Sequence, residues 1–445
     1  MTNNRKRLES IKLTIDRFFI IKILKLDYVL IALSLYFTSS INAAEFETHT
    51  LDLQTAIMKS LQHNPELASV EFQLRSADAY TEQAAVGEKP EIRFSLEDAI
   101  GSGDFSGLDG SQSTLSISWI LERSLLARRV DARKSEKGTV YVQQEIKRYD
   151  ISAETAHTFL SALAFQEQSK VSVKAEEGAR RALNDVRKRT ESGKAPMADL
   201  LRAEIELERR RLEIENIAHE LDVAKRLLAA QWGATSFNFS TLSGSLMLNR
   251  AVLDFSAMEQ RIQESPRVRV FLTQERLKQS QSALAEEEAK NRFRFKTGVR
   301  RIEQSDDYAV VFGLSIPFGG ATRNQARIAA LSEEQAGFRA DAHAEKINLS
   351  AKLYSLYEAY KHNVHLSDAL EKMIVPRLEK ALFETQKAYE VGRYSYREWS
   401  TVQQEVLAAR LELIGSRLAA HSNAVELERL TGQPILTSTS TDLEH

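Results

Sequence analysis

The sequence contains no cysteine in its 445 residues. That absence excludes disulfides, thiolate metal sites, a cysteine nucleophile and an N-terminal lipidated cysteine. Lysine and arginine together number 60 against 62 acidic residues, so the net charge is only −2. A protein whose main partner is nucleic acid needs a clustered basic excess, and this balanced composition argues against that class.

Motifs of catalysis are also missing. The sequence has no Walker loop, no zinc-protease motif and no nucleophile elbow. The nine histidines are scattered, and only His362 and His365 stand at helical spacing, without a third ligand nearby. We therefore expect no enzymatic activity, no cofactor and no metal site.

Proline and glycine are scarce, with 7 and 18 residues respectively. No proline lies between Pro90 and Pro196, and Gly193 is the only glycine between Ala179 and Gln231. Because both residues interrupt helices, their scarcity favours very long ones. Residues 123–191 are predicted to form one helix, which at 1.5 Å per residue spans roughly 100 Å. No globular core needs a helix of that length.

Two stretches of the chain repeat each other at an offset of 199 residues, so that Gly193 corresponds to Gly392 and Gly233 to Gly432. In both stretches apolar residues recur every seven positions, which indicates a coiled-coil seam. The seam residues are Leu200, Leu207, Ile214, Leu221 and Leu228, then Trp399, Val406, Leu413, Ala420 and Leu427. We predict a tandem duplication, with repeats at 45–252 and 253–433 and a polar tail at 434–445. Each repeat contains a helical hairpin that turns at a glycine.

The N-terminus has the pattern of an export signal. A segment rich in lysine and arginine precedes an apolar core at 28–37, and the small residues of 39–44 offer a cleavage site. We expect residues 1–44 to be a signal peptide. A membrane anchor is the alternative, although the apolar core is shorter than the roughly 20 residues of a spanning helix.

Four short segments alternate apolar and polar residues, as strands do. They lie at 91–99, 113–121, 292–302 and 308–318. Strands of about ten residues with one apolar face fit an outer-membrane β-barrel, but the smallest such barrels have about eight strands. The pattern alone leaves two interpretations open: a barrel shared by several protomers, or a soluble four-stranded sheet beside a coiled coil.

Several motifs, taken together and in order, resemble the TolC family of outer-membrane efflux proteins. Residues 64–67 (NPEL) resemble the motif of the family's first helix, and 193–233 resemble its return helix, of which a second copy is present. The segments at 313–325 and 376–392 resemble the heavy-metal (cobalt-zinc-cadmium) branch of the family.

The resemblance implies a mainly α fold with a transmembrane β-barrel portion, built from long antiparallel coiled-coil helices and four strands per protomer. A homotrimer would form one barrel in the outer membrane and a tunnel through the periplasm. The chain would be the exit duct of a tripartite efflux system for divalent heavy-metal cations. Its partners would be a periplasmic adaptor (membrane fusion) protein and an inner-membrane pump of the RND type.

Two other functions stay open. The first is a drug-efflux or type I protein-secretion duct, which has the same fold. The second belongs to another class and is a periplasmic coiled-coil protein without a pore.

A passive channel has no catalytic centre, so the candidate residues concern gating and docking. The resemblance implies that Asp199 and Glu398, six residues after the two tip glycines, ring a periplasmic gate, and that Tyr389 ties neighbouring helices shut. An ordinary role at helix starts is also open, because Ser395 and Glu398 fit a capping box and Asp199 lies in a first turn. Family members carry a further acidic residue one helical turn on, where this chain has arginine and threonine. The candidates for adaptor docking are Gly193, Lys194, Gly392, Arg393 and Tyr394.

Overall fold

The computed structural model describes residues 50–248, 253–317, 319 and 322–432. The expected signal peptide at 1–44 and the polar tail at 434–445 lie outside the described residues. Thr50 and Phe239–Thr241 belong to a small unit of their own, and the other described residues form one larger unit. All described helices belong to the larger unit.

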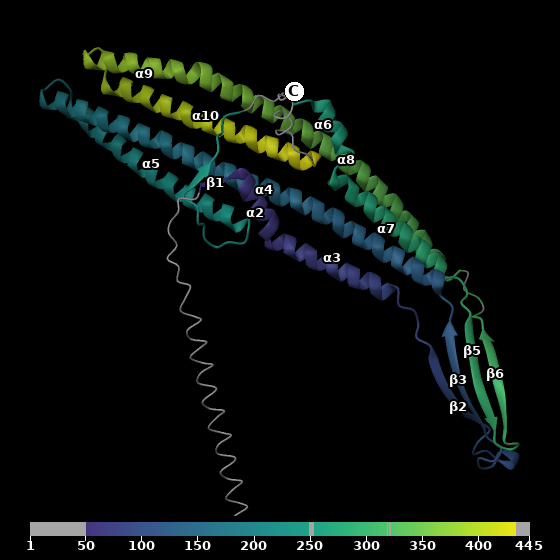
Figure 1. Cartoon of the computed structure of the whole chain (residues 1–445). Helices are drawn as coiled ribbons and strands as arrows, with labels where there is room; N and C mark the ends of the chain where they lie inside the picture. The colour runs from purple at the N-terminus through teal and green to yellow at the C-terminus, as the bar shows by residue number, and fades with distance from the viewer. Residues whose placement is uncertain (1–49, 249–252, 318, 320–321, 433–445) are drawn as a thin grey trace, which may run out of the picture. The chain divides into compact units, whose positions relative to one another are not determined.

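The first half of the chain is built around α4, Arg123–Glu191, a helix with the bounds that the sequence predicts. It is followed by a turn and by the return helix α5, Met197–Ala230. It is preceded by α2, Leu53–His63, and α3, Pro65–Ala84. Figure 1 shows α5 and α3 lying along different parts of α4, and both pack against it.

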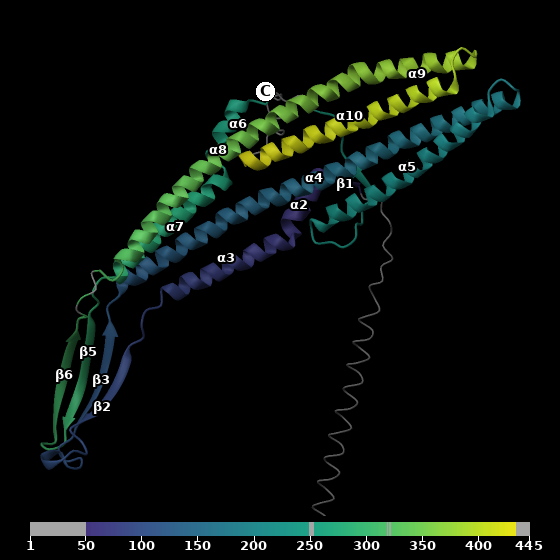
Figure 2. The same cartoon turned by 180° about the vertical axis from the view of Figure 1, so that it is seen from behind.

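The second half has the same order of elements. Its helices are α6 (Phe255–Ile262), α7 (Pro266–Glu288), α8 (Gln325–Ala369), α9 (Val375–Glu390) and α10 (Tyr396–Thr431). Helices α7 and α10 both pack against α4, so the two halves share an interface along that helix (Figure 2). Within the described ranges, no helix is both long enough and apolar enough to cross a membrane.

A π-helical turn, Leu370–Ile374, separates α8 from α9. The irregular turn lies directly before Pro376, and proline inside a helix favours a kink. Proline has no N–H to donate to the carbonyl of Lys372, and its ring crowds that carbonyl. The wider π turn removes the crowding and lets the helix continue.

The break between α2 and α3 is held by the end of α5. The Asn64 side chain accepts a 2.8 Å hydrogen bond from the backbone N–H of Glu66 and donates one of 2.8 Å to the carbonyl of Gln231. Gly233 has a φ of +76°, and a Cβ on it would lie 3.3 Å from Pro65 Cγ. The Asn-Pro motif thus starts one helix and binds the end of another.

The second half builds the same junction with different donors. The Ser265 hydroxyl donates a 2.9 Å hydrogen bond to the carbonyl of Leu430. Gly432 has a φ of +68°, and a Cβ on it would lie 3.2 Å from Pro266 Cδ. Gly233 and Gly432 are therefore both needed for a left-handed backbone turn that packs closely against a proline.

The predicted coiled-coil seams face the interior. Each seam residue is buried or half-buried, with Leu228, Ala420 and Leu427 fully inaccessible. Around the C-terminal half of α10 a buried cluster joins α6, α7 and α8 through residues such as Ile262, Val268 and Leu353. The spacing of seven therefore marks the packed side of the return helices, as predicted.

Four strands form one antiparallel sheet in the order β2-β3-β5-β6. Their bounds are Glu91–Glu97, Gln112–Ile120, Arg294–Ile302 and Asp307–Ser315. Three predicted segments are longer than the observed strands. Segments 91–99 and 308–318 run past the strand ends, because Asp98 adopts a φ of +57° and Pro317 has no N–H for pairing, and 292–302 begins two residues before β5. A short 3-10 helix, Gly103–Phe105, lies in the β2–β3 loop, and β1 (Thr50–Asp52) pairs with β4 (Thr241–Ser243).

The described chain is therefore mainly α, with two long helical hairpins and one sheet to which each half contributes a pair of strands. This architecture confirms the predicted fold class.

Candidate gate at the hairpin tips and the two faces of the sheet

The two hairpin tips have the same backbone geometry. Gly193 and Gly392 both have a positive φ, of 68° and 76°. The residue after each glycine donates a backbone hydrogen bond five residues back: Lys194 to the Arg189 carbonyl at 2.7 Å, and Arg393 to the Ala388 carbonyl at 2.8 Å. This is the Schellman pattern of helix ends, and it explains why both repeats keep glycine at this position. The side chains of Lys194, Arg393 and Tyr394 are exposed there.

Three aromatic side chains form the packed core just behind the tips. The ring of Tyr389 stacks on Trp399 at 5.1 Å between centroids, and Tyr396 contacts both in edge-on geometry at 6.4 and 6.1 Å. All three are buried, against small and aliphatic residues of α4 and α5 such as Ala182 and Leu207. The two hairpins are thus packed together by aromatic rings.

Burial governs the ionisation of these tyrosines. It raises the pKa of Tyr396 to about 12, with a smaller contribution from the negative charge of Glu206. Burial also raises the pKa of Tyr389, with Arg189 acting in the opposite direction. Within the described part of the chain the Tyr389 hydroxyl has no hydrogen-bond partner. Tyr389 therefore holds its position through its ring.

Arg189 of α4 reaches across to the second hairpin. Its guanidinium lies 4.9 Å from the centre of the Tyr389 ring, and its Nη1 donates a 2.8 Å hydrogen bond to the carbonyl of Glu390. At the offset of 199 residues, Arg189 corresponds to Ala388 and Tyr389 corresponds to Thr190. The contact therefore has no counterpart between the equivalent positions of the two repeats. Sequence reasoning missed Arg189, although the break in the repeat pattern at this position could have indicated it.

The two acidic candidates start helices, and the structure does not bring them together. Glu398 completes a capping box: its carboxylate accepts a 2.7 Å hydrogen bond from the N–H of Ser395, and its own N–H donates to the Ser395 hydroxyl at 3.4 Å. The hydrogen bonds that the Ser395 N–H and hydroxyl donate to its carboxylate, at 2.7 and 2.9 Å, lower the pKa of Glu398. Asp199 is half-buried, and its side chain forms no ion pair or hydrogen bond with the described residues. The structure therefore explains Glu398 locally and leaves the Asp199 carboxylate available.

One face of the four-stranded sheet is apolar and exposed. The register aligns Ile92 with Ile117 and Phe94 with Leu115. Continuing across the sheet, Leu115 faces Val299, which faces Val310 on the last strand. Phe312 lies on the same face, opposite Thr297, which pairs in turn with Ile117. The apolar side chains of this face are exposed, up to 73% for Ile92 and 81% for Phe312. A soluble sheet does not leave a whole face of this kind in water.

The opposite face of the sheet is polar and basic. Arg300 donates hydrogen bonds to Thr114 at 3.1 Å and Gln112 at 2.9 Å, and lies 3.5 Å from Glu97. Lys296 lies on the same face, paired across the strands with Gly313, and has no ion-pair partner among the described residues. The sheet thus separates an apolar surface from a surface that suits water.

The histidines remain scattered. In the residues that the structure describes, no group of three histidine, aspartate or glutamate side chains could hold a metal ion. His362 and His365 lie on α8 as the spacing indicates, without a third ligand among the described residues.

Comparison with known proteins finds one matching family model and one similar heavy-metal resistance protein. Residues 56–234 match the model of the outer membrane efflux protein family. The cobalt-zinc-cadmium resistance protein CzcC of Cupriavidus metallidurans is 22% identical over 383 residues, which make up 86% of this chain and 90% of that protein.

Solved structures match over most of the chain. The CusC channel has a TM-score of 0.70 at 16% identity, covering 89% of this chain and 96% of CusC. The outer membrane protein VceC of Vibrio cholerae has a TM-score of 0.69 at 15% identity, covering 86% and 96%. The open outer membrane channel MtrE of Neisseria gonorrhoeae has a TM-score of 0.66 at 13% identity, covering 86% and 89%.

The fold is that of the TolC-like outer-membrane channels. The matching family model covers residues 56–234, and over most of its length the chain is similar to the resistance protein CzcC and to TolC-like channels. The family consists of efflux channels rather than enzymes.

Proposed function

We propose that this protein is the outer-membrane exit duct of a tripartite efflux system for divalent heavy-metal cations. Three copies form the duct, with the sheets in the outer membrane and the helical hairpins in the periplasm. A periplasmic adaptor and an RND-type inner-membrane pump deliver the cations. Residues 1–44 direct export, and 45–252 and 253–433 are the two repeats of the duct.

The sheet carries this proposal. It has four strands, an exposed apolar face and free edges at β2 and β6 within the described chain. Free strand edges are not tolerated in lipid, and four strands are too few to close on themselves. Pairing β6 of one copy with β2 of the next satisfies both edges, and three copies give a barrel of twelve strands. The apolar face then meets lipid and the face with Arg300 and Lys296 lines the pore.

The proposal that the cargo is heavy-metal cations rests on a different observation, the similarity to CzcC. The relative CzcC is named for resistance to cobalt, zinc and cadmium, and the two share sequence over most of their lengths. In a passive duct the pump selects the cargo, so we place the metal specificity in the partner. The absence of a metal-binding cluster among the described residues is compatible with that division.

The tips are the proposed gate and docking surface. A ring of Asp199 and Glu398 carboxylates around the entrance favours cations over anions, as acidic rings do in cation channels. Tyr389 closes the tip by packing the second hairpin against the first. The turn residues Gly193, Lys194, Gly392, Arg393 and Tyr394 contact the adaptor, because they are the exposed ends of both hairpins.

Two neighbouring residues on opposite faces of β2 test the proposal. Phe94 lies on the apolar face and Ser95 on the polar face. An arginine on the lipid face of a barrel costs about 2–4 kcal/mol, whereas one on the pore face costs little. Phe94→Arg should therefore remove the protein from the outer membrane, and the matched control Ser95→Arg should leave it there.

The measurement is cell fractionation followed by chemical cross-linking of the outer-membrane fraction. We expect trimers of the wild type and of Ser95→Arg, and little trimer of Phe94→Arg. Release of the wild type by osmotic shock as a soluble dimer would overturn the proposal.

A further inference from the structure

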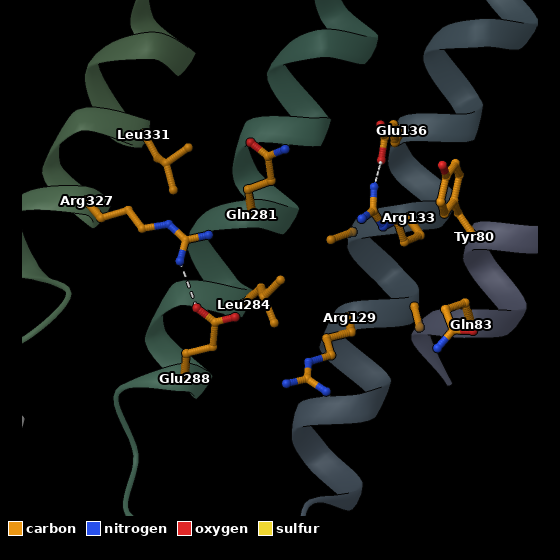
Figure 3. A pocket seen from close by; sticks show the side chains of 12 residues that line it. Tyr80, Gln83, Arg129, Arg133, Glu136, Gln281, Leu284, Glu288, Arg327 and Leu331 are labelled. Carbon is orange, nitrogen blue, oxygen red and sulfur yellow. Dashed lines mark hydrogen bonds and ion pairs between the residues drawn. The ribbon is translucent and has the colours of Figure 1, made fainter. Parts of the chain in front are cut away.

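A groove lies where the helices meet the sheet. It has a volume of about 460 Å³ and is lined by the last turns of α3 and α7, the first turns of α8 and the early turns of α4 (Figure 3). Each of these turns adjoins a strand: α3 precedes β2, α4 follows β3, α7 precedes β5 and α8 follows β6. The groove therefore forms part of a collar directly beneath the sheet.

The groove contains a cation without a counter-charge. Arg133 is paired with Glu136 at 2.7 Å, and Arg327 with Glu288 at 2.7 Å. Arg129 is half-buried and forms no ion pair or hydrogen bond with any described residue. Figure 3 shows the guanidiniums of Arg129 and Arg327 reaching from α4 and α8 into the space beside Leu284. Three cations against two anions leave a net positive charge of one.

Apart from these charged residues, the groove wall is largely apolar, with two polar side chains, Gln83 and Gln281. Leu284, Leu331 and Ala132 line it, and the half-exposed ring of Tyr80 borders it. A second hollow between α4 and α7 is lined instead by polar side chains such as Arg128, Lys134 and Ser280. On average, the α4 residues of the groove (129, 132, 133 and 136) point to a different side of the helix from those of the polar hollow (128, 131, 134 and 135), because successive helical residues are about 100° apart. The apolar groove thus suits the lipid side of the wall, and the polar hollow suits the water-filled pore.

The depth of the groove matches a phospholipid headgroup. Arg129 is six residues into α4, which places it about 9 Å beyond the start of the helix. The headgroup layer on each side of a bilayer is about 5–8 Å thick. If the sheet spans the hydrocarbon core, the Arg129 backbone lies just beyond this layer, and the phosphates on the periplasmic side are within reach of its long side chain. Arginine binds phosphate in a two-pronged geometry, and the apolar wall offers room for the first part of an acyl chain.

We propose that the groove is a binding site for an anionic glycerophospholipid of the periplasmic leaflet, whose phosphate binds Arg129 and whose acyl chain lies against Leu284 and Leu331. The bound lipid seals the collar between the sheet and the helices. This inference rests on the proposed placement of the sheet in the outer membrane. Free inorganic phosphate can bind Arg129 in the same way, but it has no acyl chain to contact Leu284 and Leu331.

The test uses the full-length protein purified in a non-ionic detergent. Short-chain phosphatidylglycerol, short-chain phosphatidylcholine and inorganic phosphate are titrated separately. Binding is followed by native mass spectrometry and by the shift of the unfolding temperature. Losing a charged hydrogen bond weakens binding by about tenfold or more. Arg129→Gln and Arg129→Glu should therefore raise the half-saturating concentration of phosphatidylglycerol at least tenfold.

The neighbouring Arg128 supplies a matched control, since it is also an arginine of α4, pairs only loosely with Asp131 at 3.8 Å and lies in the polar hollow. Arg128→Gln should bind phosphatidylglycerol like the wild type. Equal affinity of both variants for the lipid would overturn the inference, and so would stabilisation by inorganic phosphate as strong as by phosphatidylglycerol. Trimer formation of Arg129→Gln is checked by size exclusion, so that misassembly is separated from lost binding.

Failure of this inference is distinguishable from failure of the proposed function. A wild type that fractionates outside the outer membrane refutes the function. A wild type found in that membrane, together with unchanged lipid binding by the Arg129 variants, refutes the lipid site alone.

Discussion

The guanidinium of Arg189 covers the ring of Tyr389 at 4.9 Å and reaches past it to the Glu390 carbonyl at 2.8 Å. Arg189 ends the first long helix and Tyr389 ends the second, so this contact joins the two hairpins at their tips. A cation over a tyrosine ring contributes about 0.5–2 kcal/mol, and a hydrogen bond from a charged donor about 1.5–3 kcal/mol. In the gate that we propose, the contact is therefore strong enough to decide between a closed and an open tip.

Arg189→Ala should open the tip. The variant loses both contacts, which shifts the balance between closed and open states by about tenfold or more. We expect a severalfold higher mean conductance of the purified protein in planar lipid bilayers.

Arg187→Ala is the control for this variant, because Arg187 pairs at 3.5 Å with Glu204 of its own hairpin. Equal conductance of Arg189→Ala and the wild type would remove Arg189 from the gate.

Two substitutions of Tyr389 separate its ring from its hydroxyl. The hydroxyl has no partner among the described residues, so Tyr389→Phe should keep both the closed state and the unfolding temperature. Tyr389→Ala removes the stacked ring and leaves a cavity that costs about 3–5 kcal/mol, as for buried aromatic residues generally. Its conductance should rise and its unfolding temperature fall. A high conductance of Tyr389→Phe would show that the hydroxyl itself holds the gate, contrary to this account.

Gly298 is required for close packing of the sheet. A Cβ on Gly298 would lie 2.6 Å from the carbonyl oxygen of Leu115 and 2.7 Å from Ser116 Cβ. Overpacking of this kind costs about 1–3 kcal/mol. Gly298→Ala should therefore lower the amount of trimer in the outer membrane severalfold, as measured by quantitative immunoblotting.

Gly313→Ala on the neighbouring strand is the matched control, because its Cβ would make an ordinary 3.5 Å contact with Lys296. Equal yields of the two variants would contradict the close packing at Gly298.

Glu426 links α10 to α4. A 3.0 Å hydrogen bond with His157 lowers the pKa of Glu426 to about 2, and Arg429 adds to the effect. A carboxyl with a depressed pKa stabilises the folded state above its unfolded pKa of about 4.5 and loses that contribution as the pH falls to about 2. After discounting for solvent screening, we expect Glu426→Gln to cost about 1–2 kcal/mol at neutral pH.

Urea unfolding of wild type and Glu426→Gln between pH 2 and pH 7 measures this contribution. The difference between the two proteins should be constant above about pH 5 and shrink between pH 4.5 and 2. A difference that does not change with pH would mean that the carboxylate charge has no part in stability.

Much of the fold follows from periodicity. The long helix at 123–191 is predictable because this interval has only two glycines, Gly138 and Gly178, and no proline. The sheet is predictable because its strands alternate strictly, so that Phe94 and Ser95 fall on opposite faces. Strand ends and the π turn before Pro376 are less predictable, because they depend on the backbone conformation of single residues such as Asp98.

The candidate site was only partly predictable. The capping box of Glu398 is a local motif and is visible in the sequence. The contact of Arg189 with Tyr389 joins residues 200 positions apart, and only the packing of two hairpins brings them together. The role of Arg129, the groove arginine without an ion-pair partner among the described residues, is likewise apparent only when four separate helix ends are assembled around it.

The central claim is that heavy-metal cations leave the cell through this duct. Its most direct test is the growth of a strain deleted for this protein in graded zinc, cobalt, cadmium and copper. We expect hypersensitivity to at least one metal, restored by the wild type and by Ser95→Arg but not by Phe94→Arg. Unchanged metal tolerance, with sensitivity to antibiotics or detergents instead, would contradict the claim and assign organic cargo to the duct.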